Sequence, residues 1–151
     1  MILALDLGLK TGVAIRSGKG IRSATLYLKK NGKTFEQQLV YFYKFLHDFY
    51  QASLIDKDPM EIVFEMPHGG YFASTRILFS MIGCIYLFSG QTGVKTYEVS
   101  PKTVKKFNTG NGNCSKEDMI EAMEKKFNRK MSSDNEADAL GILLHHISKD
   151  A

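Results

Sequence analysis

Three acidic residues in this sequence lie within or beside apolar segments, where a buried charge would need a partner. Asp6 interrupts an apolar run near the start of the chain, Glu65 ends a second apolar run, and Asp138 stands between two alanines. An isolated carboxylate is costly in a low-dielectric interior, so a buried one is normally paired, hydrogen-bonded or bound to metal. Any one of the three is best explained as an unrelated surface acid or cap, but the three together indicate a shared site.

Asp6 also has a simple structural interpretation. It is followed by Lys10, Thr11 and Gly12, so it could cap a turn or form an ion pair with Lys10. An acid near the end of a central strand is, however, also how a catalytic carboxylate is held rigidly at the carboxyl edge of a sheet. The decision depends on whether the chain brings other carboxylates to the same edge.

Asp138 falls in a predicted helix whose small residues indicate close packing on a sheet. The residues three and four positions earlier share its face of the helix, and these are Asn135 and Asp134. Glu136 is rotated by about 200° from Asp138. With Ser133 it forms a capping-box pattern, which is the better explanation for it.

The side chains gathered in this way are oxygen donors. Hard oxygen ligands in this number suit Mg²⁺ or Mn²⁺ rather than zinc. Two such ions about 3.5–4 Å apart can activate water and stabilise the leaving oxygen in phosphodiester cleavage. The candidate chemistry is therefore metal-dependent hydrolysis.

The elements that must position these residues begin with strands and then alternate. Strands are predicted within residues 2–8 and over residues 11–16, 21–29, 61–67 and 94–99. Helices are predicted from Thr34 to the 56–59 segment, over 74–89, from Pro101, and over 116–127 and 134–148. This order indicates an α/β fold, with a mixed five-stranded sheet flanked by helices, in the shape of a ribonuclease H-like domain.

The predicted helix over residues 74–89 is apolar on almost every side. A helix of this kind is buried on more than one side. In a small domain, one side would pack on the sheet and the other on a second subunit, which predicts a homodimer. The alternative is a central core helix wrapped by its own chain.

Size and composition describe an ordinary globular chain. Its 151 residues are most simply one domain spanning 1–151. The net charge of +4 permits a polyanionic partner without proving one. Cys84 and Cys114 match neither a disulfide framework nor a metal knuckle, which predicts free thiols in a reducing compartment. The sequence predicts neither a signal peptide nor a membrane span.

Four lysines flank a loop of glycine and asparagine over residues 108–113. They are Lys102, Lys105, Lys106 and Lys116. Loop amides and lysines can neutralise phosphates without reading a sequence. For any single lysine, a solvated helix face is an equally good explanation.

Four motifs carry a family resemblance. They are ILALDLGLKTGVAI at residues 2–15, VFEMPH at 63–68, SPKTVKKFNTGNGNCSK at 100–116 and NEADAL at 135–140. In this order they resemble the RuvC crossover junction endonucleases, most closely the short phage-type members, over essentially the whole chain. The combination is specific, whereas the Asp-x-Gly pattern alone also occurs in sugar kinases and actin-like ATPases.

The resemblance implies a homodimer that binds four-way (Holliday) junctions and nicks two opposing strands with Mg²⁺ held by acids. Asp6, Glu65 and Asp138 match three of the metal-binding carboxylates. The fourth position, usually Asp or His, is Asn135 here, so either its carbonyl oxygen or the carboxylate of Asp134 would complete the site. The setting implied is the cytoplasm of a bacterial cell or of a phage-infected host, and the sequence identifies no branch-migration partner.

The resemblance also implies DNA contacts outside the metal site. An aromatic wedge follows the Glu65 strand in the family, and Tyr71 and Phe72 are the local candidates. Without the resemblance, they are as readily explained as loop anchors. Lys10, beside Asp6, is expected to approach the scissile phosphate.

Three rival hypotheses remain. Asn135 is compatible with a branched-DNA-binding module whose catalytic site is impaired. A nuclease of the same fold could act on a broader range of branched or RNA-containing substrates. An actin-like phosphotransferase would need a second lobe and a second phosphate loop, for which 151 residues leave no room.

Overall fold

The computed structural model describes residues 1–67 and 72–149, apart from the side chains of residues 72–74. Its centre is a five-stranded sheet in the order β3-β2-β1-β4-β5. The strands are β1 (Ile2–Asp6), β2 (Lys10–Ser17), β3 (Gly20–Tyr27), β4 (Glu61–Glu65) and β5 (Lys95–Val99). The helices are α1 (Leu28–Asn31), α2 (Phe35–Ile55), α3 (Phe72–Thr92), α4 (Pro101–Thr109), α5 (Lys116–Phe127) and α6 (Asp134–Ser148).

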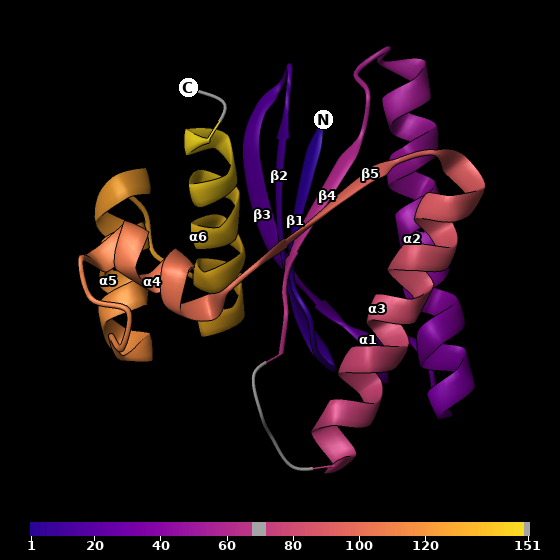
Figure 1. Ribbon diagram of the computed structural model, residues 1–151, viewed down its shortest axis with the longest axis horizontal. Helices are drawn as coiled ribbons and strands as arrows, with labels where there is room; N and C mark the ends of the chain where they lie inside the picture. The colour runs from indigo at the N-terminus through magenta and orange to yellow at the C-terminus, as the bar shows by residue number, and fades with distance from the viewer. Residues whose placement is uncertain (68–71, 150–151) are drawn as a thin grey trace.

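The sheet is mixed, as the sequence predicts. β2 runs antiparallel to both β1 and β3, whereas β1, β4 and β5 are parallel to one another. Helices α2 and α3 cover one face of the sheet and α4, α5 and α6 lie on the other (Figure 1). The carboxyl ends of β1 and β4 therefore meet at one edge, where β2 begins.

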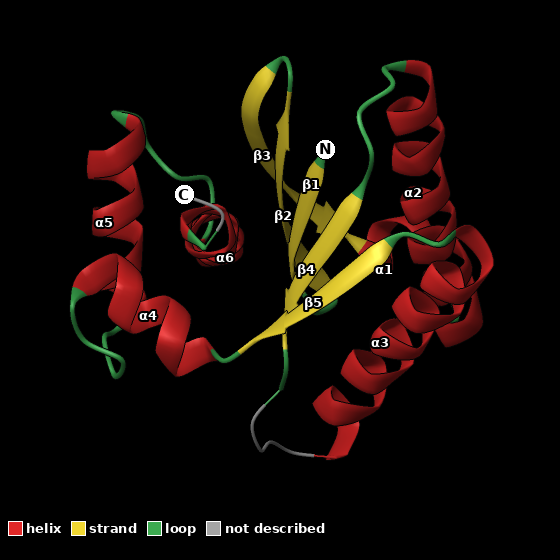
Figure 2. Cartoon of the chain, turned by 45° about the horizontal axis from the view of Figure 1, so that its top comes forward, coloured by secondary structure: helices red, strands yellow, loops and turns green. Residues whose placement is uncertain are grey.

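The two faces of the sheet build separate cores. In β1, Leu3 and Leu5 belong to the core shared with α2 and α3, whereas Ala4 belongs to the core shared with α6. Ala137 and Ala139 of α6 are completely buried in that second core. The expected close packing of this helix on the sheet is thus confirmed, and Figure 2 shows α6 end-on, between the sheet and helices α4 and α5.

One predicted boundary is wrong. The sequence predicts a third strand that continues to residue 29, but β3 ends at Tyr27 and the next four residues form α1. Leu28 is fully buried, and its N–H donates to the carbonyl of Leu9 at 3.0 Å. This bond joins the residues just beyond the paired ends of β2 and β3, and the chain turns into α1 there with Leu28 in the core.

The sequence also pairs Thr34 with Gln37 and Ser115 with Asp118 at the capping-box spacing, and both of these predicted boxes are confirmed. Thr34 with Gln37 caps α2, and Ser115 with Asp118 caps α5, each with both reciprocal hydrogen bonds. At the start of α4, Ser100 occupies the N-cap position but its hydroxyl makes no capping hydrogen bond.

The capping box predicted at the start of α6 is wrong in part. The Ser133 side chain does accept the N–H of Glu136, at 3.0 Å. The Glu136 carboxylate does not return to Ser133, because it accepts hydrogen bonds from Ser132, Ser23 and Arg129 instead. These partners, of which Ser23 lies 113 residues away in the sequence, outcompete the local cap.

Helix α3 has one buried face and one exposed face. Met81, Ile85 and Phe88 are fully buried, whereas Phe79 and Leu87 remain 52% and 57% exposed. The described chain therefore does not wrap α3 on every side. A second subunit on the exposed face remains a prediction. None of the described helices has the length and apolar character that crossing a bilayer requires.

Candidate active site

Strand register brings Asp6 and Glu65 together. In the parallel pair of β1 and β4, Leu5 lies opposite Phe64, so the next residue of each strand is an acid at the same edge. Side chains alternate between the faces of a sheet. Since Ala4 and Val63 belong to the core beneath α6, Asp6 and Glu65 also face α6.

Gly12 allows α6 to reach the same edge. It lies opposite Asp6 in the ladder of β1 and β2. A Cβ atom at Gly12 would stand 1.8 Å from the backbone oxygen of Asn135 and 3.2 Å from the Cβ of Ala139. Only glycine leaves room for this approach, which places the first turns of α6, with Asp138, beside the strand ends.

The charges confirm that the three carboxylates are neighbours. Burial raises the pKa of Asp6 well above its usual value, and the negative charges of Asp138, Glu65 and Asp134 raise it further. Burial and the charge of Asp138 raise the pKa of Glu65 to about 7. The pKa of Asp138 is raised to about 6, chiefly by burial. The site is thus a partly buried group of acids that destabilise one another's ionised forms.

Two of the predicted DNA-binding lysines lie close enough to act on these acids. The charge of Lys105 lowers the pKa values of Glu65 and Asp138, against the larger effect of burial. Lys116 forms an ion pair with Asp134, and their hydrogen bond lowers the pKa of Asp134. The charge of Lys116 also acts on Asp6 and Asp138.

The donor set suits a hard divalent cation. In the described ranges, no three histidine, cysteine, aspartate or glutamate side chains are gathered tightly enough to hold a metal. The chemistry of the set nevertheless fits one: Asp6, Glu65 and Asp138 supply oxygen donors whose ionised forms are destabilised, chiefly by burial, so that added positive charge would stabilise them. Mg²⁺ or Mn²⁺ would supply that charge, and both prefer oxygen ligands.

The remaining predicted residues are distributed unevenly. Lys10 is exposed at the start of β2, and Lys102 and Lys106 are exposed on α4. Phe72 is the first residue of α3, but neither its side chain nor any part of Tyr71 is among the described parts of the chain. The proposed aromatic wedge therefore stays a prediction.

Asn135 and Asp134 occupy different surroundings in the first turn of α6. Asn135 is half-buried and its backbone carbonyl lies over Gly12. The Asp134 carboxylate is directed to Lys116. Both remain near the acids, since the charge of Asp134 raises the pKa values of Asp6 and Asp138.

Sequence reasoning missed two contributions to this site. Gly12 is the residue that admits α6, and its position opposite Asp6 could have suggested a close approach once the hairpin was recognised. The pairing of Lys116 with Asp134 had no sequence signal, because 18 residues separate them and they belong to different helices.

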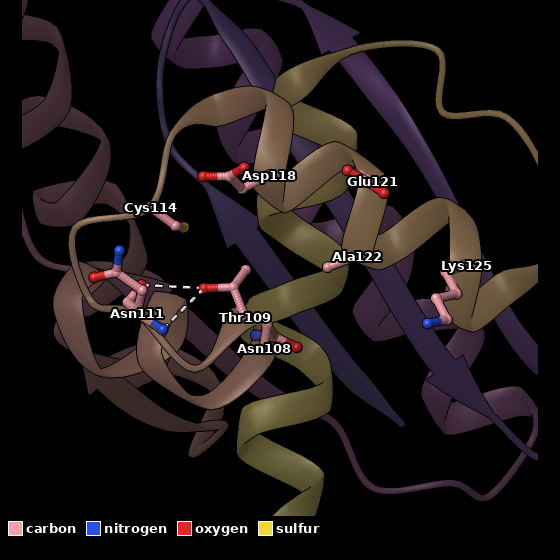
Figure 3. Close-up of a pocket in the computed structure, with 8 residues that line it drawn as sticks. All are labelled: Asn108, Thr109, Asn111, Cys114, Asp118, Glu121, Ala122 and Lys125. Atoms are coloured by element: carbon pink, nitrogen blue, oxygen red, sulfur yellow. Dashed lines mark hydrogen bonds between the residues drawn. The ribbon is translucent and has the colours of Figure 1, made fainter.

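A separate pocket of about 310 Å³ lies between α4 and α5 (Figure 3). Its lining includes Asn108, Thr109, Asn111 and Asp118, but none of the three carboxylates. Thr109 and Asn111 bond to each other there, and Asp118 is engaged in the cap of α5. The pocket is therefore a feature of the helical layer and not part of the carboxylate site.

The strand order, the mixed sheet and the helices on both faces define a ribonuclease H-like fold. The chain is similar to a structure of Thermus thermophilus RuvC, with 20% identity and a TM-score of 0.67 over 97% of this chain and 92% of that chain. It is also similar to T. thermophilus RuvC in complex with a Holliday junction substrate, with 18% identity and a TM-score of 0.71 over 99% and 93%. No protein-family model and no curated protein sequence matches the chain.

Proposed function

We propose that this protein is a metal-dependent, structure-selective DNA endonuclease that resolves four-way junctions. The observation that carries the proposal is the group of Asp6, Glu65 and Asp138 at one edge of the sheet, with pKa values raised chiefly by burial and, for Asp6 and Glu65, further by the charge of Asp138. The fold shared with T. thermophilus RuvC, which has been captured with a Holliday junction, supports this choice of substrate.

The proposed chemistry assigns the carboxylates to hold Mg²⁺ or Mn²⁺, with two ions per site. When bound, the ions supply a nucleophilic water and stabilise the leaving oxygen. Asp6, Glu65 and Asp138 fix the position of this charge because they stand on two strand ends and one tightly packed helix. Cleavage in this scheme leaves a 5′-phosphate and a 3′-hydroxyl.

Lysines would position the substrate phosphates. Lys105 and Lys116 already act on the carboxylates, so a phosphate drawn to them would lie beside the acids. Lys10, Lys102 and Lys106 are exposed and would neutralise flanking phosphates. Tyr71 and Phe72 are proposed to support the opened bases near the junction centre.

Asn135 is the better candidate for the fourth metal ligand. The Asp134 carboxylate is engaged with Lys116, so it would have to give up that ion pair in order to bind a metal. Asn135 can offer a neutral amide oxygen, which is a ligand type that Mg²⁺ accepts. We therefore propose that Asn135 ligates and that Asp134 orients Lys116.

A homodimer would place two such sites on opposing strands. Phe79, Tyr86 and Leu87 on the exposed face of α3 are apolar or aromatic side chains that a second copy could cover. Symmetric, paired nicks follow from two-fold symmetry. The cytoplasm of a bacterial or phage-infected cell is the proposed setting, and a short phage-type RuvC member is the proposed affiliation.

The test is a nicking assay on a synthetic four-way junction, with linear duplex and a replication fork as comparisons, in Mg²⁺, Mn²⁺ or EDTA. We expect paired symmetric nicks on the junction alone, lost in EDTA and lost in Asp6→Asn, while Asp6→Asn still binds the junction. The control Asp48→Asn changes an exposed acid on α2 and should nick normally.

Other outcomes would favour the alternatives. Nicking of forks and flaps as well would indicate a broader branched-DNA nuclease. Tight binding without nicking in either metal would indicate a binding module, with Asn135 the first residue to change to Asp. An Asp6→Asn variant that still nicks in Mg²⁺ would show that the site is assigned wrongly.

A further inference from the structure

A basic groove lies between α1 and the first half of α2, on the face of the sheet opposite to α6. It encloses about 720 Å³, and its lining includes Lys30, Lys33, Lys44, Glu36, Gln37 and Tyr41. The lining therefore carries three lysines and one acid. The groove shares no residue with the carboxylate site or with the basic segment of α4 and α5.

The lysines of this groove differ from others on the surface. Among the described residues, Lys19, Lys116 and Lys130 each form an ion pair with a carboxylate. No described carboxylate pairs with Lys30, Lys33 or Lys44. All three side chains are exposed, so their charge is available to a ligand from solution.

The groove is linked through strand pairing to the edge that carries the carboxylates. Asp6 lies opposite Gly12, and Lys10, two residues before Gly12, lies opposite Tyr27 at the end of β3. The ammonium group of Lys30 stands 4.4 Å from the centre of the Tyr27 ring. Figure 1 shows α1 and the beginning of α2 at the end of the sheet where β1 finishes. Positive charge therefore continues from Lys10 around this edge.

We propose that this groove is a second DNA-backbone site, which holds a duplex arm of the branched substrate beyond the cleavage point. The inference rests on the proposed function, since it assigns part of the same substrate to a surface that the cleavage site does not include. Lysines act as point charges toward phosphate, and contacts to phosphate carry no sequence information. Gln37 is engaged in the cap of α2 and Asn31 bonds the carbonyl of Tyr27, so the groove contributes affinity rather than sequence preference.

The experiment compares two triple variants, both built in the non-cleaving Asp6→Asn protein. The groove variant is Lys30→Ala, Lys33→Ala and Lys44→Ala. The matched control is Arg22→Ala, Lys95→Ala and Lys149→Ala, which removes three exposed charges at or near the opposite end of the sheet. Circular dichroism and thermal melting establish that both are folded.

Binding to long-armed and short-armed four-way junctions is then measured as a function of salt. Each phosphate contact adds about 0.9 to the magnitude of the slope of log K against log salt. On the long-armed junction, this slope should therefore be smaller in magnitude by up to about 2.7 for the groove variant than for its parent. Its slope on a junction whose arms are too short to reach the groove should equal that of the control.

The two hypotheses fail in different ways. If the parent binds and nicks junctions but the groove variant matches the control on long arms, only the groove inference is overturned. If the groove variant loses affinity equally on short arms, the charge acts at a distance and the arm contact is wrong. If the parent neither binds nor nicks a junction in either metal, the proposed function fails and the groove assignment fails with it.

Discussion

Two acids at the start of α6 are separated by a single residue, but their surroundings shift their pKa values in opposite directions. Glu136 is 2% exposed and accepts hydrogen bonds from Ser132, Ser23 and Arg129. Burial alone would raise its pKa, but these donors lower it to about 2. Asp138 faces other acids, and burial raises its pKa to about 6.

The difference shows how one helix can serve both stability and chemistry. The fold satisfies the charge of Glu136 completely, so that acid holds α6 to β3 and to the segment before α6. Burial destabilises the ionised form of Asp138, so that acid is available to a cation. A buried acid is therefore informative about function when its surroundings leave its ionised form destabilised, and not merely when it is buried.

Substituting Asp138 should give the largest effect, and on activity alone. Asp138→Asn removes one proposed ligand but also one repulsive charge. We expect junction nicking to fall by roughly 10²–10³-fold or more, while the melting temperature is unchanged or higher. A variant that is inactive only because it unfolds would contradict the separation of the two roles.

Substituting Glu136 should give the reverse pattern. Glu136→Ala leaves Arg129 and the hydroxyls of Ser23 and Ser132 without their acceptor; Arg129 is 43% exposed and can be solvated, so the loss is about 1–3 kcal/mol, typical of unmade buried hydrogen bonds. Urea unfolding should show this loss of stability. At a temperature where the variant is folded, Mn²⁺ affinity should match that of the unchanged protein; a large loss of affinity would show that the two acids are not independent.

The two kinds of acid should also give stability opposite dependences on pH. The pKa of Glu65 rises from 4.5 to about 7 on folding, so the folded state binds its proton more tightly and stability falls as pH rises through this window. The pKa of Glu136 drops from 4.5 to about 2, so its contribution is complete above pH 4.5 and is lost as pH falls toward 2. The free energy of unfolding lost through Glu65 as pH rises through this window, the upper limb of the pH profile, should amount to about 1–3 kcal/mol.

Thermal melts between pH 2 and 8, without added metal, would measure both limbs. Glu65→Gln should flatten the limb above pH 4.5 and leave the lower limb intact. If the upper limb persists in Glu65→Gln and in Asp138→Asn, the repulsion assigned to these acids is wrong.

Asn135 offers a smaller change that sharpens the comparison. Asn135→Asp adds a fourth carboxylate beside three that already repel one another. We expect Mn²⁺ binding, measured by calorimetry, to tighten about tenfold, which is about 1.4 kcal/mol, and the metal-free protein to melt earlier. Unchanged affinity would indicate that the Asn135 side chain does not reach the metal.

The ion pair of Asp134 with Lys116 should contribute least to stability. Both side chains are partly exposed, and exposed pairs are worth about 0–1 kcal/mol. Asp134→Asn should therefore melt almost normally. If it weakens Mn²⁺ binding more than Asn135→Ala does, then Asp134 and not Asn135 is the fourth ligand.

Much of the fold was available from the sequence because its signals are local. The apolar run of β1, the caps at Thr34 and Ser115 and the alanines of α6 each depend on neighbours a few residues away. The end of β3 at Tyr27 was not available, since it depends on the tertiary core into which Leu28 is buried. The carboxylate of Glu136 was misassigned for the same reason, because its partners include Ser23, 113 residues away.

By itself, the sequence determined which residues could do chemistry: acids at two strand ends and on a small-residue helix face. Residue type and local periodicity are sufficient for that. Only the tertiary structure decided which acids share a site, because parallel register aligns Asp6 with Glu65 and Gly12 admits α6 beside them. It also decided which charges are satisfied, since electrostatic energy depends on distance and burial, and neither is written in the order of residues.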